Sequence, residues 1–241
     1  MQTDSLLRAF GLPIVACVRG LPGLLVVAMF MSTVALAQDT ESAVEAGAES
    51  SAEVAPVAKL EQYILSLNSF EATFKQTLYD GESEQPLQSS SGTIKLKRPG
   101  RFVWTYDSPE PQLIVGDGQR IWLYDEGLEQ VTVNKIDERI NGTPLQLLME
   151  ASPLTDGFDI ESLGQADSID WFALIPTTQS SDFEQVFIGL KGDAIAAMEL
   201  RDSFGQATQI QLSDFRKDVP LADELFEFDV PEGVDVIGLD E

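Results

Sequence analysis

Few residues in this 241-residue chain could carry out catalysis, because it contains no histidine and only one cysteine. A chain without histidine cannot form a Ser-His-Asp triad, a Cys-His pair or an imidazole metal site. Acidic residues cluster at Asp125, Glu126 and Glu129 and again at Asp137 and Glu138, and a glycosidase uses a pair of carboxylates. Neighbouring acids are nevertheless expected by chance in a chain with 40 Asp and Glu residues. We therefore expect no catalytic residue, no metal and no cofactor, and we expect that the chain is not an enzyme.

The polar side chain that its surroundings set apart is Arg98, at the mouth of a predicted strand-to-strand turn. It lies in a stretch, residues 92–124, that predicts four short strands, since Pro and Gly interrupt it at three turns. The turns are residues 98–100, 108–111 and 116–118. The last of these lacks the lysine and the following helix of a phosphate-binding loop, so we interpret it as a hairpin turn.

Large apolar residues of this stretch fall on alternate positions of the predicted strands, which favours one apolar face of a sheet. They are Ile94, Leu96, Phe102, Trp104, Tyr106, Leu113 and Val115. Aromatic residues are crowded around them, with Phe70 and Phe74 before the stretch and Trp122 and Tyr124 at its end. So much aromatic surface either fills a core or lines a pocket. We favour a pocket, because only short predicted helices are available to cover the face.

The remaining segments predict one strongly curved antiparallel sheet of about ten strands with two or three short helices. One helix is expected to start at Pro56 and to bury Leu60, Ile64 and Leu67. A second is expected after Thr143, with an apolar side formed by Leu145, Leu147, Leu148 and Met149. Further strands are expected at residues 70–78, 129–133, 171–175, 185–190, 194–201, 206–212 and 225–228.

Residues 1–37 are expected to be a secretory signal peptide, cleaved after Ala37. Basic residues precede an apolar run, residues 21–34, and small residues follow it at the expected cleavage site. Two alternatives stay open: a transmembrane anchor formed by the same run, and a lipid attached to Cys17 in a lipoprotein-like box. If cleavage follows Ala37, the mature chain has no cysteine, although it enters an oxidising compartment.

Residues 38–56 predict a disordered acidic tether, because they are rich in Ala, Ser and Glu and contain no aromatic residue. The glutamates recur every four residues and would repel one another in a helix. They are Glu41, Glu45, Glu49 and Glu53. The folded domain is expected to span residues 57–241. The formal net charge of −25 argues against nucleic acid as a partner.

Seven short motifs, spread in order over residues 57–240, carry a family resemblance. They are SFEATFKQ (69–76), KRPGRFVW (97–104), DG (117–118), WLY (122–124), EQ (129–130), TP (143–144) and LFEFDVPEGV (225–234). In their order and spacing they resemble the outer-membrane lipoprotein carrier protein family, LolA. The resemblance implies an unclosed antiparallel β-barrel, or strongly curved sheet, with a short-helix lid over an apolar concave face.

The resemblance also implies a function in the periplasm, as a monomeric carrier without enzymatic activity. Such a carrier accepts acylated lipoproteins from the inner-membrane ABC transporter LolCDE and passes them to the outer-membrane receptor LolB. The family's functional arginine falls on Arg98, which is implied to bind backbone carbonyls of the lid when the lid is closed. The implied lid residues are Ile64, Leu145, Leu148 and Met149. The acyl-chain cavity is expected to be lined by Phe70, Phe74, Phe102, Trp104, Tyr106, Leu113 and Trp122.

Two other functions stay open from the sequence. One is an outer-membrane lipoprotein receptor of the same fold, which would carry a lipid on Cys17. The other is a periplasmic hydrolase that uses a carboxylate pair such as Asp125 and Glu129.

Overall fold

The computed structural model of the protein describes residues 45–80, 85–136, 148–149, 152–177 and 183–238. The chain divides into two compact units, Met1–Val54 and Ala55–Glu241, and the fold given below is that of the second unit. None of the helices that the structure describes has the length and hydropathy needed to cross a bilayer. The predicted signal peptide, residues 1–37, lies outside the described residues.

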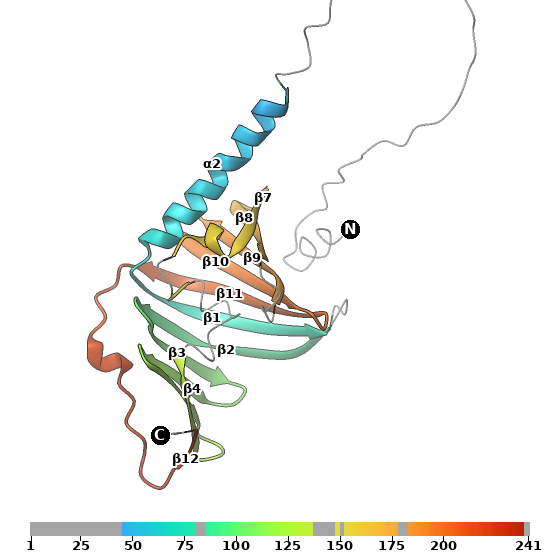
Figure 1. Ribbon diagram of the computed structural model, residues 1–241. Helices are drawn as coiled ribbons and strands as arrows, with labels where there is room; N and C mark the ends of the chain where they lie inside the picture. The colour runs from blue at the N-terminus through green and yellow to red at the C-terminus, as the bar shows by residue number, and fades with distance from the viewer. Residues whose placement is uncertain (1–44, 81–84, 137–147, 150–151, 178–182, 239–241) are drawn as a thin grey trace, which may run out of the picture. The chain divides into compact units, whose positions relative to one another are not determined.

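The described strands form one curved sheet of twelve strands (Figure 1). In chain order they are β1 Ser69–Asp80, β2 Pro86–Lys97, β3 Arg101–Ser108, β4 Gln112–Asp117, β5 Arg120–Asp125, β6 Gln130–Lys135, β7 Phe158–Ala166, β8 Ile169–Pro176, β9 Phe183–Lys191, β10 Ala194–Asp202, β11 Gln206–Lys217 and β12 Asp235–Ile237. Their order in space is β12-β6-β5-β4-β3-β2-β1-β11-β10-β9-β8-β7. Neighbours are antiparallel except β12 and β6, which are parallel. The sheet is therefore open at β12 and β7, and the predicted fold class is confirmed.

The strands predicted between residues 92 and 124 are present, and each of the three predicted turns separates two of them. The sequence does not predict β7 or β12. Both are edge strands: β7 carries a register shift between Ser162 and Gly164, and all three residues of β12 are exposed. A strand that buries little apolar surface leaves a weak alternating pattern. The strand predicted at residues 225–228 is wrong, since the 3₁₀ helix η2, Asp223–Phe226, occupies its first half.

The helix α2 spans Glu45–Ser66 and contains Pro56, so the predicted start at Pro56 is wrong. Residues 45–56, the second part of the expected acidic tether, belong to this helix. Alanine and glutamate are strong helix formers, and repulsion between glutamates four residues apart is only about 0.2–0.5 kcal/mol per pair. Helix propensity therefore outweighs the charge pattern from which disorder was expected.

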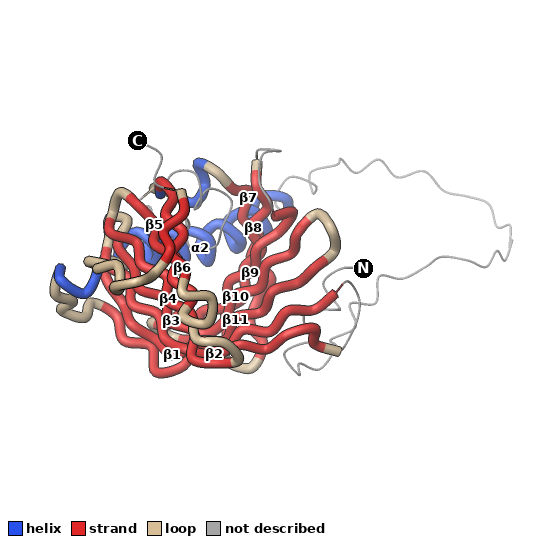
Figure 2. The backbone as a smooth tube through the Cα atoms, turned by 90° about the horizontal axis from the view of Figure 1, so that it is seen from below, coloured by secondary structure: helices blue, strands red, loops and turns tan. Residues whose placement is uncertain are grey.

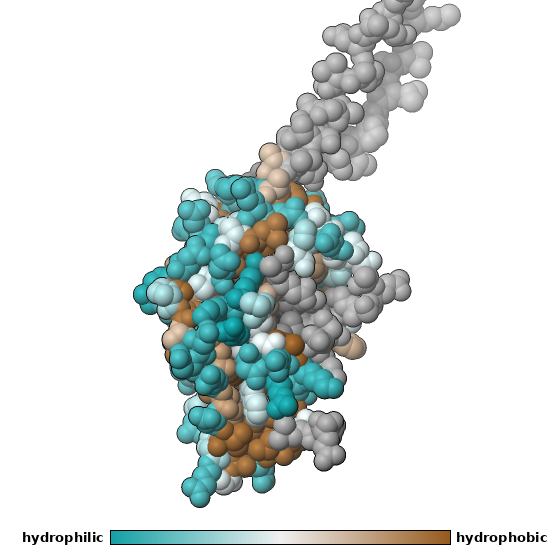
Figure 3. All heavy atoms as spheres, turned by 60° about the vertical axis from the view of Figure 1, so that its left-hand side comes forward, coloured by the Kyte–Doolittle hydropathy of each residue, from teal (hydrophilic) through white to brown (hydrophobic). Residues whose placement is uncertain are grey.

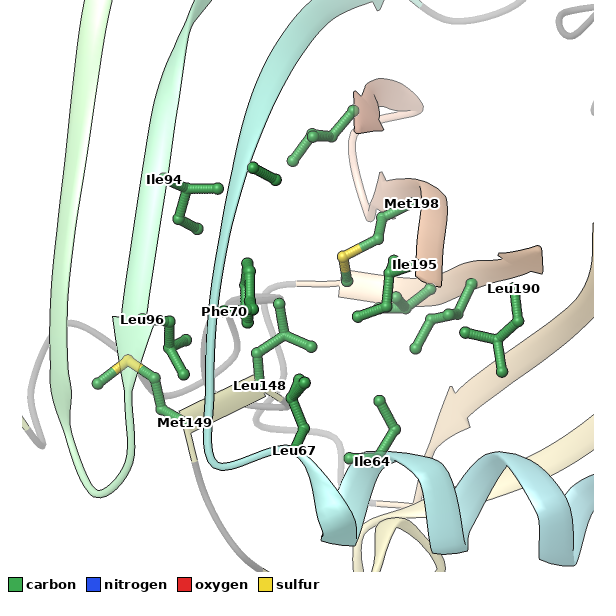
Figure 4. Packing of buried hydrophobic residues seen from close by; sticks show 14 of the residues in the cluster. Ile64, Leu67, Phe70, Ile94, Leu96, Leu148, Met149, Leu190, Ile195 and Met198 are labelled. Carbon is green, nitrogen blue, oxygen red and sulfur yellow. The ribbon is translucent and has the colours of Figure 1, made fainter. Parts of the chain in front are cut away.

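The end of α2 packs into the concave side of the sheet, as the view from below indicates (Figure 2). Leu60, Ile64 and Leu67 of this segment have no exposed surface. They form one apolar cluster with side chains from both halves of the sheet, and Figure 4 shows these side chains converging from α2, from residues 148–149 and from the strands. Among the strand residues of the cluster are Phe70, Ile94, Leu96, Leu190, Ile195 and Met198. The core thus lies between the concave face and its helical cover.

The convex side of β3 to β6 is covered by the chain after β11. In this C-terminal strap, residues 218–234, Phe226 is fully buried and the ring of Phe228 lies 5.7 Å from the ring of Trp122. Asp223 of the strap receives hydrogen bonds from Lys97 Nζ at 2.5 Å and Arg101 Nη1 at 2.6 Å. The strap therefore has both apolar and ionic attachment to the outside of the sheet.

Exposed apolar side chains gather at the end of the molecule where β12 lies. Figure 3 shows a largely hydrophilic surface with hydrophobic atoms concentrated at its lower end, which is the end labelled β12 in Figure 1. Leu128, in the turn before β6, is 71% exposed, and Val236 and Ile237 of β12 are also exposed. An open strand edge with apolar side chains is typical of a surface that contacts other molecules.

Candidate functional site

Arg98 joins the sheet to the two segments that cover its concave face. Its backbone N–H donates to Asn68 O at 2.8 Å, which fixes the residue at the end of β2. Its side chain donates from Nε to Leu148 O and from Nη1 to Ile64 O, each at 2.7 Å. One guanidinium therefore binds the last turn of α2 and the helical residues 148–149 at the same time.

The acceptors of Arg98 suit a fixed fork of donors. Ile64 O belongs to the end of α2, where carbonyls lack partners within the helix, and it also accepts from Leu67 N. Negative partial charge accumulates at a helix C-terminus, which offsets part of the cost of burying a cation. Burial lowers the pKa of Arg98, but an arginine stays charged at any physiological pH. The bonds to the lid carbonyls do not depend on pH in this range.

An aromatic cluster forms the part of the concave face beyond Phe102. The ring of Phe74 lies 5.1 Å from Trp104 and 5.1 Å from Tyr106, edge to face in both cases. Trp104 and Tyr106 stack at 6.1 Å. The hydroxyl of Tyr106 donates to Gln76 Oε1 at 3.1 Å, and burial raises the pKa of Tyr106 to about 12. The concave face thus changes from purely apolar near Arg98 to apolar with polar tips near Gln76.

In this structure the apolar face is covered. Phe70 is 0% and Phe102 1% exposed, and Leu148 and Met149 are 3% and 4% exposed. Their covering partners come from α2 and from the helical residues 148–149, and Arg98 bonds to both. Moving these two segments away would uncover the face, and an uncovered face of this kind would be a large apolar patch.

Two of the expected cavity residues lie on the other side of the sheet. Trp104 pairs with Ile114, and Val103 pairs with Val115, so Leu113 and Val115 face outward. Trp122 pairs with Val115 and is covered by Phe228 of the strap. The alternation has period two within a strand, but the length of each turn sets its phase in the next strand, and a shift of one residue reverses the face. The expectation for Leu113 and Trp122 is therefore corrected.

The other expected residues are placed as follows. Phe70, Phe74, Phe102, Trp104 and Tyr106 lie on the concave face with Ile64, Leu148 and Met149. Leu145 lies outside the described residues, as do Asp137 and Glu138.

The carboxylates near the β4–β6 turns have structural partners. Asp117 accepts from Trp122 Nε1 and from two backbone N–H groups of its own turn. Asp125 accepts from Leu128 N in the same manner. Burial raises the pKa of Asp117, but the hydrogen bonds from Trp122 and the turn outweigh this, so its pKa is lowered overall. Within the described residues no group of acidic, histidine or cysteine side chains is arranged to hold a metal ion.

A hollow of about 450 Å³ lies elsewhere, over β1, β2 and β11. Most of its lining side chains are hydroxyls or amides that alternate with the inward-facing Phe74 and Leu212, so it opens on the outer face. They are Thr73, Ser89, Ser91, Ser108, Gln211 and Ser213, with Lys75. Its polar lining separates it from the apolar face under α2.

Sequence reasoning missed two parts of the site. The far arm of the concave face comes from β8 to β10, through residues such as Phe172, Ile188 and Met198. These strands were expected from the sequence, and the alternation within each strand could have shown which of its faces is apolar. The alternation could not show that this apolar face packs together with the aromatic residues of β1 and β3. The second omission is Gln76. It is a polar residue at a position of β1 where the alternation places inward-facing apolar residues, and this exception could have indicated a role.

Comparisons with known proteins point to one family. Residues 66–229 match the family model described as outer membrane lipoprotein carrier protein LolA. The outer-membrane lipoprotein carrier protein of Methylococcus capsulatus is 40% identical over 190 residues, 79% of this chain and 91% of that protein. The protein of the same name from Methylobacillus flagellatus is 37% identical over 182 residues, 76% and 88% of the two chains.

A solved structure, a LolA superfamily protein from Nitrosomonas europaea, aligns over 71% of this chain and 97% of that one, with 12% identity and a TM-score of 0.44. The family match extends from the end of α2 to the strap and includes Arg98 and both sides of the sheet. This chain therefore belongs to the outer-membrane lipoprotein carrier protein family, LolA.

Proposed function

We propose that this protein is a periplasmic chaperone that carries acylated lipoproteins and shields their acyl chains against the concave apolar face. The observation that carries the proposal is the pair of bonds from Arg98 to Ile64 O and Leu148 O. Both covers of the apolar face bond to this one side chain, so a change at Arg98 would act on both covers together.

The energetics agree with a carrier. An acyl chain with roughly fifteen methylenes gains about 12 kcal/mol on leaving water, at about 0.8 kcal/mol per methylene. A lipid-anchored protein therefore cannot cross an aqueous compartment unaided. In the empty carrier the lid occupies the same face, so that unloading exchanges acyl chains for the side chains of Leu60, Ile64 and Leu67.

The route is part of the proposal. The carrier receives its cargo from the inner-membrane ABC transporter LolCDE and delivers it to the outer-membrane receptor LolB, and it acts as a monomer. It reaches the periplasm through a signal peptide cleaved after Ala37. Membership of the family supports this route.

The test is release of a radiolabelled lipoprotein from spheroplasts of a Gram-negative bacterium by the purified mature protein. We expect a soluble complex that contains carrier and lipoprotein. Mass spectrometry of the mature chain accompanies it: an N-terminus at Gln38 supports the carrier, whereas a diacylated Cys17 would indicate a receptor. A protein that releases no lipoprotein under these conditions is not a carrier.

A further inference from the structure

The concave side of the sheet contains hydrogen-bond donors that have no acceptor. Among the described residues, Arg98 Nη2 and Trp104 Nε1 are buried there without a partner. Both are N–H groups, and among the residues that the structure describes on this side no buried side-chain acceptor is left without a donor. A buried donor without an acceptor costs about 1–3 kcal/mol, and such groups are rare in native proteins. An excess of donors indicates that the missing group is an acceptor.

The position of Trp104 is fixed by its neighbours. Phe74 contacts its ring at 5.1 Å from one side and Tyr106 stacks on it at 6.1 Å. The indole therefore cannot rotate to another acceptor without breaking both contacts. Tyr106 donates to Gln76 Oε1, and the amide nitrogen of Gln76 carries two N–H donors. Trp104 and Gln76 thus present donors on the same face of the sheet.

The surroundings select a neutral acceptor. The partners of Trp104 across the sheet are Ile94 and Ile114, and the partners of Tyr106 are Gly92 and Gln112. None of them is charged. Arg98 follows Ile94 by four residues, about 13 Å along an extended strand, so the cation is too distant to neutralise a carboxylate at the indole. An ester or amide carbonyl beside alkyl chains fits this setting, whereas a free fatty acid anion does not.

We infer that Trp104 Nε1, assisted by Gln76, binds the ester carbonyl of the acyl chains that the protein carries. This inference rests on the proposed function, since it names the group of the cargo that the concave face recognises. It also orients the cargo. The ester ends lie at the aromatic cluster near Gln76, and the alkyl chains extend toward Phe70 and the turn at Arg98.

The test compares two synthetic probes on the intact mature protein. One is a lipopeptide whose cysteine carries a dipalmitoyl glyceryl group, and the other is its dialkyl ether, which has the same chains without carbonyls. Dissociation constants are measured by displacement of a fluorescent fatty-acyl dye. One hydrogen bond of this kind corresponds to a roughly five- to tenfold difference in affinity.

Two variants assign the effect to the indole. Trp104→Phe keeps an aromatic ring and removes the N–H, so we expect the ester-to-ether affinity ratio to fall five- to tenfold. Trp122→Phe is the matched control: its Nε1 donates to Asp117 on the outer side, and the ratio should stay as in the wild type. If the indole binds the carbonyl directly, Trp104→Phe changes the ester-to-ether affinity ratio, and does not merely weaken binding of both probes equally.

Each contrary outcome has a distinct meaning. If Trp104→Phe weakens both probes equally, or leaves the ratio unchanged, the indole does not bind the carbonyl and the inference is overturned, with a bound water as the partner of Nε1. If neither probe binds to the wild type, the proposed function fails as well. If both bind and only the ratio is unaffected, the carrier function stands without this site.

Discussion

Replacing Arg98 by leucine should shift the protein from its closed form toward an open one. The change removes two hydrogen bonds of 2.7 Å, to Leu148 O and Ile64 O. Bonds from a charged donor contribute about 1.5–3 kcal/mol each. Because part of Arg98 contacts solvent and water can replace some of its bonding, we take about 3 kcal/mol for both, which lowers the ratio of closed to open protein by a factor of about 100.

The consequence for transport follows from the end state of unloading, which is the closed, empty carrier. Destabilising it makes unloading less favourable, while loading is unaffected or improved. We expect Arg98→Leu to accept lipoprotein, to transfer it poorly to the receptor, and to show faster amide hydrogen exchange at residues 60–66. Arg98→Lys, which keeps the charge but not the fork, should be intermediate.

The control is Arg120→Leu, which removes an exposed arginine at the start of β5. It should behave like the wild type in exchange and transfer. An Arg98→Leu protein with wild-type hydrogen exchange in α2 and wild-type lipoprotein transfer would refute the reasoning. The two bonds would then not control the opening of the lid.

Three further perturbations test the sheet and its strap. Gly92→Ala should lower the free energy of unfolding by about 1–3 kcal/mol, because an added Cβ would lie 1.8 Å from Thr105 O, a backbone atom; urea unfolding measures this, and Gly157→Ala, with open space around the added carbon, is the control. Phe228→Ala should cost about 2 kcal/mol, less than a fully buried Phe, and shift tryptophan emission to the red by uncovering the rings beneath it; an unchanged spectrum would contradict the role of the strap. The lowered pKa of Asp117 means that its contribution to stability is complete above the unfolded pKa of 3.8 and is lost as pH falls through the folded value. Asp117→Asn should therefore flatten the pH dependence of the urea midpoint below about pH 5, and an equally steep profile would show that other carboxylates dominate.

Local pattern was enough to predict the fold class. Alternating apolar residues with Pro and Gly between them located β3 to β5 to within a few residues, and the second half of β2, because turn chemistry and strand periodicity are properties of neighbouring residues. The sheet partners of each strand are not local. Trp122 and Leu113 were assigned to the wrong face because the phase of alternation depends on the turns, which sequence reasoning did not resolve.

The site was predictable in part for a similar reason. Arg98 stood out through the family motif that contains it, and the carbonyl atoms it reaches lie 34 and 50 residues away in the chain. Contacts between residues so far apart in the chain result from the tertiary fold, and the spacing of residues in the sequence does not reveal them. The strap could not be anticipated either, since the contact of Phe228 with Trp122 joins residues whose separation carries no periodic signal.

The attachment of Arg98 to β2 and Asn68 has a consequence for how the carrier can work without a fuel molecule. Arg98 is fixed to the sheet by its backbone, so opening would break its two side-chain bonds to the lid, and would separate the lid from the apolar cluster, while the bond of Arg98 N to Asn68 O stays in place. In the proposed transfer, a receptor whose groove binds acyl chains more strongly than the carrier would drive release of the lipoprotein without an energy source in the carrier. The direction of transfer would then be set by the higher affinity of the receptor for acyl chains, and the empty carrier would close again unchanged.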